Sequence, residues 1–167
     1  MRNVLALAAL ALTFVLSTGS HAVAVFDDAS LIAEVRSGWQ DAMNERDLLG
    51  VLTWYAPGAV VLPAGAAPRL GAEEIADWHG RWLFHADVYY TFEARSLRVD
   101  GRWALEEWEA EVTVTPRGDG KTAIGDDPLQ FRQSGFRVYR KDRAGRWRID
   151  REIWSDELPQ VRELRRF

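Results

Sequence analysis

The stretch from Phe136 to Trp154, FRVYRKDRAGRWRIDREIW, constrains the fold of this chain more than any other. Two runs rich in aromatic and β-branched residues, which favour strands, flank the short segment from Asp142 to Gly145. Gly145 supplies the positive φ that a tight turn needs, and Asp142 can hydrogen-bond its own backbone as the chain reverses. The pattern predicts a β-hairpin. Because an isolated hairpin is not stable in water, the rest of the chain must supply further strands and a helical layer.

Helical periodicity dominates the first half of the chain. Apolar residues at helical spacing predict an amphipathic helix from about Asp28 to Arg46, whose start Asp27 or Asp28 can cap. A second, short helix is expected from Leu48 to Tyr55, capped by Asp47 and followed by a proline-glycine stop. A third helix is expected to begin after Gly71.

One short strand is expected before the third helix, and four long strands are expected after it. A short strand is expected over Ala59–Leu62, followed by a loop rich in proline and glycine. From Val88 the apolar period becomes two, and long strands are predicted over 88–99, 103–115, 131–141 and 146–154, with a mobile loop over 116–128. The order of elements predicts an α+β domain with helices on one face of a curved antiparallel sheet, and an open mouth between helices and sheet.

The start of the chain has the pattern of a secretory signal peptide. A short basic segment leads into an apolar run from Val4 to Leu16, and Ala22-x-Ala24 offers a small-residue cleavage site after either alanine. The interpretation is a signal peptide over residues 1–24 and one domain over 25–167, exported to the periplasm or secreted, with no membrane contact after removal. The alternative is a retained membrane anchor.

Composition narrows the classes of partner and cofactor. The formal charge of −4 becomes −5 once Arg2 is removed, which argues against nucleic acid or an anionic membrane as the main partner. The chain has no cysteine, so disulfides, thiolate nucleophiles and cysteine-ligated metals are excluded. Two histidines, His79 and His85, without a nearby carboxylate motif make a poor metal site, and no metal or cofactor is expected.

Two segments carry a resemblance to a known superfamily. They are RDLLGVLTWYAPGAVVLPAGAAPRLGAEEI, residues 46–75, and VYRKDRAGRWRIDREIWSD, residues 138–156. The first resembles the nuclear transport factor 2-like superfamily in its ketosteroid isomerase and SnoaL-like branches. The second is similar to the last hairpin of secreted, mostly uncharacterised SnoaL-like proteins. The resemblance implies a cone-shaped fold with three helices packed on the concave face of the sheet, and a homodimer through the outer face. It indicates the fold strongly and the reaction weakly, because the superfamily includes isomerases, dehydratases, cyclases, epoxide hydrolases and non-catalytic binders.

The catalytic residues of ketosteroid isomerases do not carry over. Where those enzymes have an aspartate before the proline that matches Pro63, this chain has Leu62, and Trp39 stands at the position of their oxyanion tyrosine. Their second aspartate has no carboxylate counterpart between Phe136 and Tyr139. The resemblance therefore implies the fold without that isomerase mechanism.

His79 and Arg151 are the candidate catalytic residues. His79 is expected near the face of the third helix that looks into the cone, where it could act as a base, although packing is the alternative. Arg151 shares strand parity with Ile149 and Ile153, which places it on the apolar face, where it could hold a carboxylate. The alternative is an arginine at the rim or paired with Glu109 or Glu152.

Three further sets of side chains complete the interpretation. Glu107, Glu109 and Glu111 share one face of a strand, as a solvated row or as carboxylates in the pocket. A basic cluster, namely Arg137, Arg140, Lys141, Arg143, Arg146 and Arg148, is interpreted as solvated surface. The expected pocket residues, which could also be core, are Trp39, Trp54, Tyr55, Leu62, Trp78, Trp82 and Trp108.

The expected function is binding of a small, largely apolar molecule in the cone. The alternatives are a cofactor-independent lyase or isomerase with His79 as general base, and a homodimerisation module without ligand. No nucleic-acid partner is expected.

Overall fold

The computed structural model describes residues 27–117 and 127–157. The predicted signal peptide, most of the predicted loop over 116–128 and the polar tail lie outside the described residues. The described part contains three helices, α1 (Asp28–Asn44), α2 (Leu48–Thr53) and α3 (Gly71–His85). Its strands are β1 (Tyr55–Leu62), β2 (Arg69–Leu70), β3 (Ala86–Asp100), β4 (Trp103–Pro116), β5 (Leu129–Lys141) and β6 (Trp147–Glu157).

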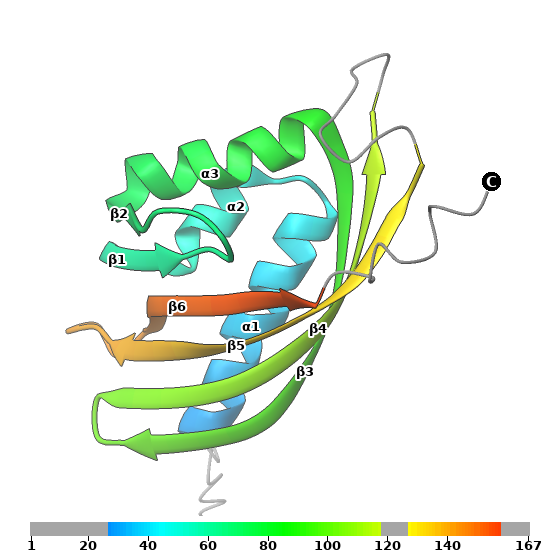
Figure 1. Ribbon diagram of the computed structural model, residues 1–167. Helices are drawn as coiled ribbons and strands as arrows, with labels where there is room; N and C mark the ends of the chain where they lie inside the picture. Colours follow the sequence, from blue (N-terminus) through cyan, green and yellow to red (C-terminus); the bar gives the residue numbers. More distant parts are fainter. Residues whose placement is uncertain (1–26, 118–126, 158–167) are drawn as a thin grey trace, which may run out of the picture.

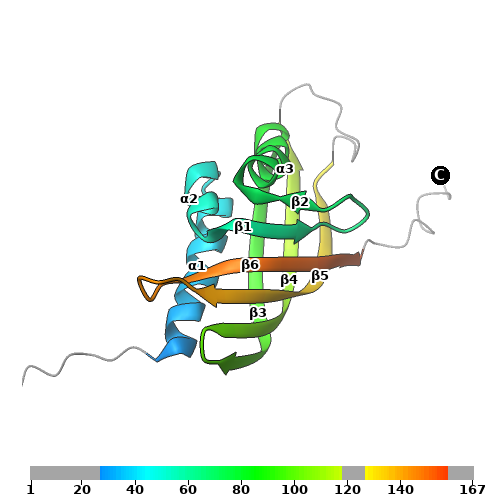
Figure 2. The same cartoon turned by 90° about the vertical axis from the view of Figure 1, so that its left-hand side faces the viewer.

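The strands form one six-stranded sheet in the order β2-β1-β6-β5-β4-β3. Neighbouring strands are antiparallel except β1 and β6, which are parallel. The sheet curves strongly along β3 and β4, and the helices lie on its concave side (Figures 1 and 2). This is the predicted α+β cone, with a mixed sheet where four antiparallel strands and one short strand were expected.

Local signals place the helix starts and turns where the sequence predicts them. The Asp27 carboxylate accepts from the Ser30 N–H at 2.7 Å at the start of α1, and Asp47 accepts from the Gly50 N–H at 2.9 Å at the start of α2. Gly145 in the β5–β6 turn has a φ of 80°, the left-handed conformation that glycine adopts without steric cost.

The predictions were wrong about the end of α2 and the start of β1. Helix α2 ends at Thr53, and Tyr55 already belongs to β1. The Ile149 N–H donates to the Trp54 carbonyl at 2.8 Å, and Tyr55 pairs with Ile149. Pairing with the distant strand β6 therefore outweighs the local helical periodicity. The two-residue strand β2 was likewise not predicted.

The main core lies between α1 and the concave face of the sheet. Ile32, Val35 and Trp39, spaced as one helical stripe, are buried there together with Tyr139 and Ile149 from the hairpin. A smaller apolar cluster on β3 and β4 continues the same face toward the mouth of the cone. The core thus fills the narrow end of the cone and leaves its wide end to the pocket described below.

A bulge in β6 exchanges the two faces of that strand. Tyr139 lies opposite Ile149 and Val138 lies opposite Arg151, so Asp150 is an extra residue. After the bulge Glu152 points inward, whereas Arg151 points outward. The predicted position of Arg151 on the apolar face is wrong, because that prediction assumed unbroken alternation.

The acidic row of β4 faces outward. Glu109 pairs with Arg95 at 2.5 Å and Glu111 pairs with Arg132 at 3.6 Å, both across neighbouring strands. This is the solvated arrangement that the sequence left open, and the even-numbered residues of the strand face the cone instead.

Candidate ligand pocket and its buried polar network

A pocket opens between the concave face of the sheet, α1 and α3. Its cavity volume is about 60 Å³, and the wider hollow around it, of about 620 Å³, includes open solvent at the mouth. Its polar lining residues are His79, Gln133, Glu152 and Asp156, beside the phenol of Tyr90. The aromatic lining residues are Trp39, Trp78, Trp82, Tyr90, Phe92, Trp108, Phe131 and Trp154. Such a lining suits a flat, largely apolar molecule.

The predicted pocket residues divide into two groups. Trp39, Trp78, Trp82 and Trp108 line the pocket. The remaining predicted residues, Trp54, Tyr55 and Leu62, do not.

Trp54 packs against Gly38 of α1. A Cβ at Gly38 would lie only 2.1 Å from the Trp54 ring, so the missing side chain makes room for the indole. Leu62 pairs with Ile153 on the neighbouring strand. Trp54 and Leu62 therefore serve packing and sheet pairing outside the pocket.

A buried ion pair lies at the floor of the pocket. The Nε of Arg137 donates to Oε1 of Glu152 at 2.6 Å, and the exposed fractions of the two side chains are 0% and 2%. Removing both charges from water is costly, and close pairing offsets that cost. The interpretation of Arg137 as part of a solvated basic surface is therefore wrong.

The Tyr55 hydroxyl joins this ion pair to the pocket wall. It donates to Oε2 of Glu152 at 2.6 Å and accepts from Nε1 of Trp39 at 3.1 Å. Burial, followed by the charge of Glu152, raises the pKa of Tyr55 well above its ordinary value. Tyr55 thus lies directly behind the pocket as a neutral hydrogen-bonding group.

His79 completes the network from α3. Its Nε2 lies 3.2 Å from the Tyr55 hydroxyl. Because that hydroxyl uses its hydrogen for Glu152, the arrangement is satisfied by Nε2–H of His79 donating to Tyr55, with Nδ1 unprotonated. Burial lowers the pKa of His79 to about 4, against an opposing effect of Glu152. His79 is therefore a neutral imidazole at neutral pH, at the pocket wall where the sequence places it.

Arg137 has aromatic rings around its guanidinium. The centroids of Trp39, Phe92 and Trp108 lie 4.5, 4.6 and 5.4 Å from its central carbon. Burial lowers the pKa of Arg137, but the charge of Glu152, the hydrogen bond to Glu152 and the nearby phenols of Tyr139 and Tyr55 together outweigh burial, and the net shift is upward. Neither Nη1 nor Nη2 has a hydrogen-bond partner among the described residues, so the ring faces supply the remaining stabilisation.

A second buried carboxylate lies deeper in the core, at the narrow end of the cone. Glu106 on β4 has no exposed surface, and its Oε2 accepts from the Tyr139 hydroxyl at 2.6 Å. The guanidinium of Arg36 on α1 pairs with its other oxygen. The core thus contains two carboxylates, each satisfied by one arginine and one tyrosine.

Sequence reasoning missed the groups that organise the pocket floor. Glu106 has the parity of Trp108, and Arg137 has the parity of Tyr139, so alternation could have placed both inside. Glu152 lies beyond the bulge, and no alternation rule reveals it. Arg151, the predicted clamp, instead donates to the Gly58 carbonyl at 3.3 Å and pairs with Asp150 at 2.8 Å, outside the cone.

The part of the chain that the structure describes lacks two further features. Within 27–117 and 127–157, no cluster of three or more histidine, aspartate or glutamate side chains has the arrangement of a metal site. Over the same ranges no helix is long and apolar enough to cross a membrane.

Solved structures with the same architecture define the class of fold. A ketosteroid isomerase-like protein from Erwinia carotovora atroseptica superposes with a TM-score of 0.69 at 19% identity, covering 80% of this chain and all of the other. An NTF2-like protein of unknown function from Pseudomonas putida gives 0.57 at 22%, covering 80% and 89%. A cystatin-like domain of unknown function from Nostoc punctiforme gives 0.59 at 19%, covering 82% of each chain. The chain has the NTF2-like cone fold.

A sequence family matches as well. The SnoaL-like domain matches residues 37–148, which is most of the chain and includes the second half of α1, α2, α3 and β1 to β5, but only the first two residues of β6. This protein therefore belongs to the SnoaL-like family, as the sequence resemblance implied. No curated protein matches the chain significantly.

Proposed function

We propose that this protein is exported and binds a small, largely apolar molecule in the aromatic pocket. The observation that carries the proposal is a pocket lined by eight aromatic side chains over a floor whose buried charges are paired. Because Glu152 is engaged by Arg137 and Tyr55, the floor does not require a charged ligand. Export rests on the sequence of residues 1–24.

The polar groups at the wall would orient such a ligand. His79 and Gln133 are buried there, and Asp156 at the end of β6 accepts from Gln133 at 2.8 Å. A ligand with one or two polar atoms on an aromatic or alicyclic body would satisfy both parts of the lining. The convergence of these groups on a cavity supports ligand binding over a dimerisation module without ligand.

Two measurements test this proposal. Native mass spectrometry of protein purified from its exported compartment detects a retained ligand. Titration with the neutral fluorescent probe N-phenyl-1-naphthylamine then measures binding in the pocket. Val114→Phe fills the pocket wall, and Val138→Phe on the outer face is the matched control. We expect saturable probe binding, lost in Val114→Phe and kept in Val138→Phe. Equal binding by both variants, or none by the wild type, would contradict the proposal.

A second candidate function is a cofactor-independent lyase or isomerase with His79 as the base. It is favoured by one observation: a neutral imidazole at the pocket wall, held by Tyr55 and through it by Glu152. The unprotonated Nδ1 would take a proton from an acidic C–H of the ligand, while Tyr55 fixes the ring. Arg151, outside the cone, has no place in this version.

Proton exchange separates the two candidates. A molecule retained by the purified protein would be incubated with it in D₂O, and deuterium uptake at carbon followed by mass spectrometry. Uptake with the wild type but not with folded His79→Gln would support the enzyme. Absence of uptake with unchanged ligand affinity would favour plain binding.

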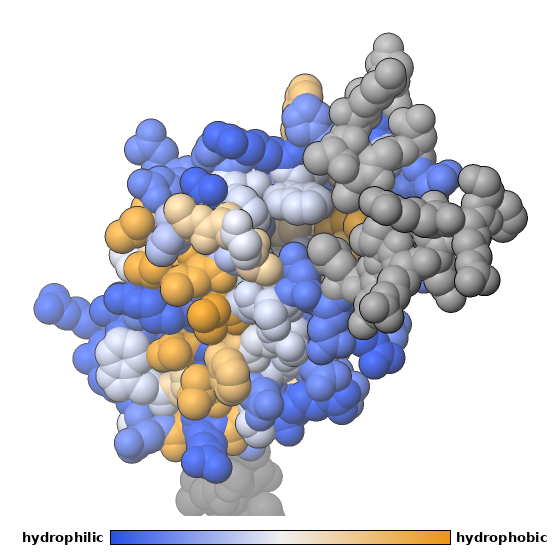
Figure 3. Space-filling model, in the orientation of Figure 1, coloured by the Kyte–Doolittle hydropathy of each residue, from blue (hydrophilic) through white to orange (hydrophobic). Residues whose placement is uncertain are grey.

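We also propose that a second copy covers the outer face of the sheet. Exposed apolar side chains, including Leu105, Phe136 and Ile153, gather there in a band (Figure 3). Glu107 lies toward one end of this band along the strands, and Arg140 lies toward the other. A two-fold axis across the strands would therefore bring Glu107 of one copy near Arg140 of the other. Light scattering should give a dimer mass that Phe136→Asp reduces to that of a monomer, and a monomeric wild type would refute this.

A further inference from the structure

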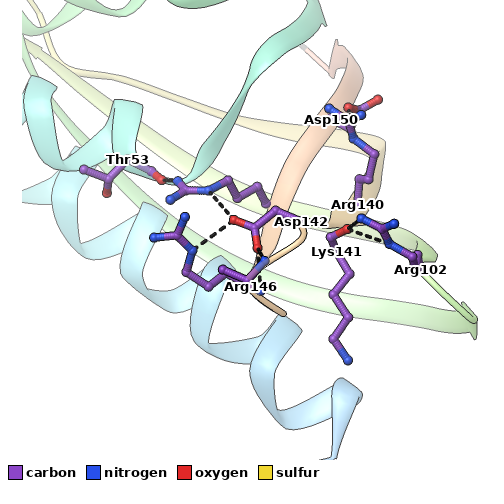
Figure 4. Close-up of polar contacts among 9 residues, drawn as sticks. Thr53, Arg102, Arg140, Lys141, Asp142, Arg146 and Asp150 are labelled. Carbon is purple, nitrogen blue, oxygen red and sulfur yellow. Dashed lines mark hydrogen bonds and ion pairs between the residues drawn. The ribbon is translucent and has the colours of Figure 1, made fainter.

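A second hollow, here called the basic cleft, lies where the β5–β6 turn meets α2 and the start of β1. It shares no lining residue with the aromatic pocket. One wall is largely apolar and is formed by Leu52, Tyr55, Ala56, Pro57 and Ala72. The other wall is lined by six cationic residues, Arg102, Arg140, Lys141, Arg143, Arg146 and Arg148, and by Asp142. The Lys141 ammonium points away from the other cations, toward Asp28 of α1 (Figure 4).

The positive charge of the basic cleft exceeds the negative charge that pairs with it. Arg146 and Arg148 share the single carboxylate of Asp142, at 2.9 and 3.7 Å. Arg140 pairs with Asp150 at 2.8 Å, and Lys141 pairs with Asp28. The residues that line the basic cleft thus carry six positive charges, and three carboxylates pair with four of them, in a protein whose formal net charge is −4.

Two arginines of the basic cleft have no carboxylate partner among the residues that the structure describes. Arg102 donates from Nε and Nη2 to the Lys141 carbonyl, at 3.1 and 2.8 Å. Arg143, at the tip of the turn, makes no hydrogen bond or ion pair within the described ranges. Both side chains are exposed and can add a charged partner without losing an existing ion pair.

The cationic wall is held in place by the backbone, as Figure 4 shows. The Asp142 carboxylate accepts from the N–H groups of Ala144 and Arg146, at 2.8 and 3.0 Å, which fixes the turn. The hydrogen bonds from the Arg146 backbone and side chain and from the Ala144 N–H keep the pKa of Asp142 below its ordinary value. Arg148 donates to the Thr53 carbonyl, which ties the hairpin to the end of α2. Ordered arginines lose less entropy when they bind a ligand.

We propose that the basic cleft binds the phosphate or sulfate group of a small molecule, whose apolar part lies against the wall formed by α2 and β1. The planar guanidinium presents paired donors that match the oxygens of these groups. The negative charge of the whole protein disfavours a long polyanion, because most of such a chain would lie outside the basic cleft. A compact oxyanion meets only the local excess of positive charge.

Calorimetric titration of the full chain with inorganic tripolyphosphate tests this. We expect saturable binding that weakens as salt rises, because the contact is between exposed charges. The Arg102→Gln/Arg143→Gln double variant should lower affinity about tenfold or more, since two charge-assisted contacts are lost. Arg95→Gln/Arg132→Gln removes the same charge away from the basic cleft and should change affinity less than about twofold.

Sedimentation with vesicles identifies the source of the phosphate. Tripolyphosphate binding without binding to phosphatidylglycerol vesicles assigns the basic cleft to a soluble phosphate or sulfate ester. Binding to those vesicles but not to phosphatidylcholine, lost in Arg102→Gln/Arg143→Gln, assigns it to a lipid headgroup. Binding to neither, or equal loss in the cleft and control variants, overturns the proposal whether or not the aromatic pocket binds its probe.

Discussion

Arg137 and Arg140 lie three residues apart on the same strand and show two ways in which this fold carries positive charge. Arg137 is fully buried, paired with Glu152 and surrounded by rings, whereas Arg140 is 44% exposed beside an excess of other cations. A charge in the core persists only with a matched partner, because nothing else replaces its hydration. At the surface, hydration stabilises cations that outnumber their carboxylate partners. The charges at the pocket floor are therefore neutralised, whereas the residues of the basic cleft keep an excess of positive charge.

The largest expected effect comes from breaking the buried pair. Arg137→Leu leaves Glu152 buried beside Tyr55 without its cation, and should lower the free energy of unfolding by about 3–5 kcal/mol. The matched change Arg140→Leu should cost less than about 1 kcal/mol. Urea unfolding measures both. If the double variant Arg137→Leu/Glu152→Leu recovers most of the loss, the cost is that of an unpaired charge; similar losses for both arginines would refute the contrast.

Acidification should lower the free energy of unfolding through His79 at the pocket wall. The folded-state pKa of His79, about 4, lies below its unfolded value of 6.5, so the folded state favours the neutral ring. Its contribution is complete above pH 6.5 and is lost as the pH falls toward 4, by up to about 3 kcal/mol.

Comparing the pH dependence of unfolding in histidine variants and in the wild type separates the titration of His79 from that of the carboxylates. Unfolding free energies at pH 7 and pH 4.5 should differ less in His79→Leu than in the wild type, while His85→Gln should behave like the wild type. Parallel pH profiles for all three proteins would show that His79 is not held neutral.

Tyr139→Phe probes the second carboxylate of the core. Glu106 loses the hydroxyl at 2.6 Å but keeps Arg36, so we expect a loss of about 2 kcal/mol in unfolding free energy. Tyr89→Phe is the control, because Tyr89 is 58% exposed, and it should have almost no effect. An unchanged free energy of unfolding in Tyr139→Phe would mean that Arg36 alone satisfies Glu106.

The smallest effect is expected at the basic cleft. Arg143→Gln removes one cation from a wall with surplus positive charge, and should change stability by less than about 0.5 kcal/mol. Thermal unfolding at low and high salt measures it. A large loss would show that Arg143 holds the turn together and is not available to a ligand.

The fold was predictable because its strongest signals are local. The hairpin around Gly145, the capping by Asp27 and Asp47 and the paired strands β3 and β4 depend on short-range periodicity and turn chemistry. The start of β1 at Tyr55 was not predictable, because its pairing with β6 brings together segments that are far apart in sequence.

The candidate site was predictable only in part. The position of His79 and four of the tryptophans followed from helix and strand periodicity. The inward position of Glu152 and the outward position of Arg151 depend on one extra residue, Asp150, whose side chain is held by Arg140 and Arg151. Those contacts exist only in the folded sheet, so alternation alone gave the wrong face.

The hydrogen bond between Tyr55 and Glu152 joins residues that are 97 positions apart. Glu152 belongs to the last described strand, so the polar network can close only after all residues from Tyr55 to Glu152 have been synthesised. Contacts of such long range make folding slow, and the unfinished chain lacks the ion pair that neutralises its core. The core is therefore neutralised only when β6 joins the sheet, so the segment before β6 cannot form this core by itself.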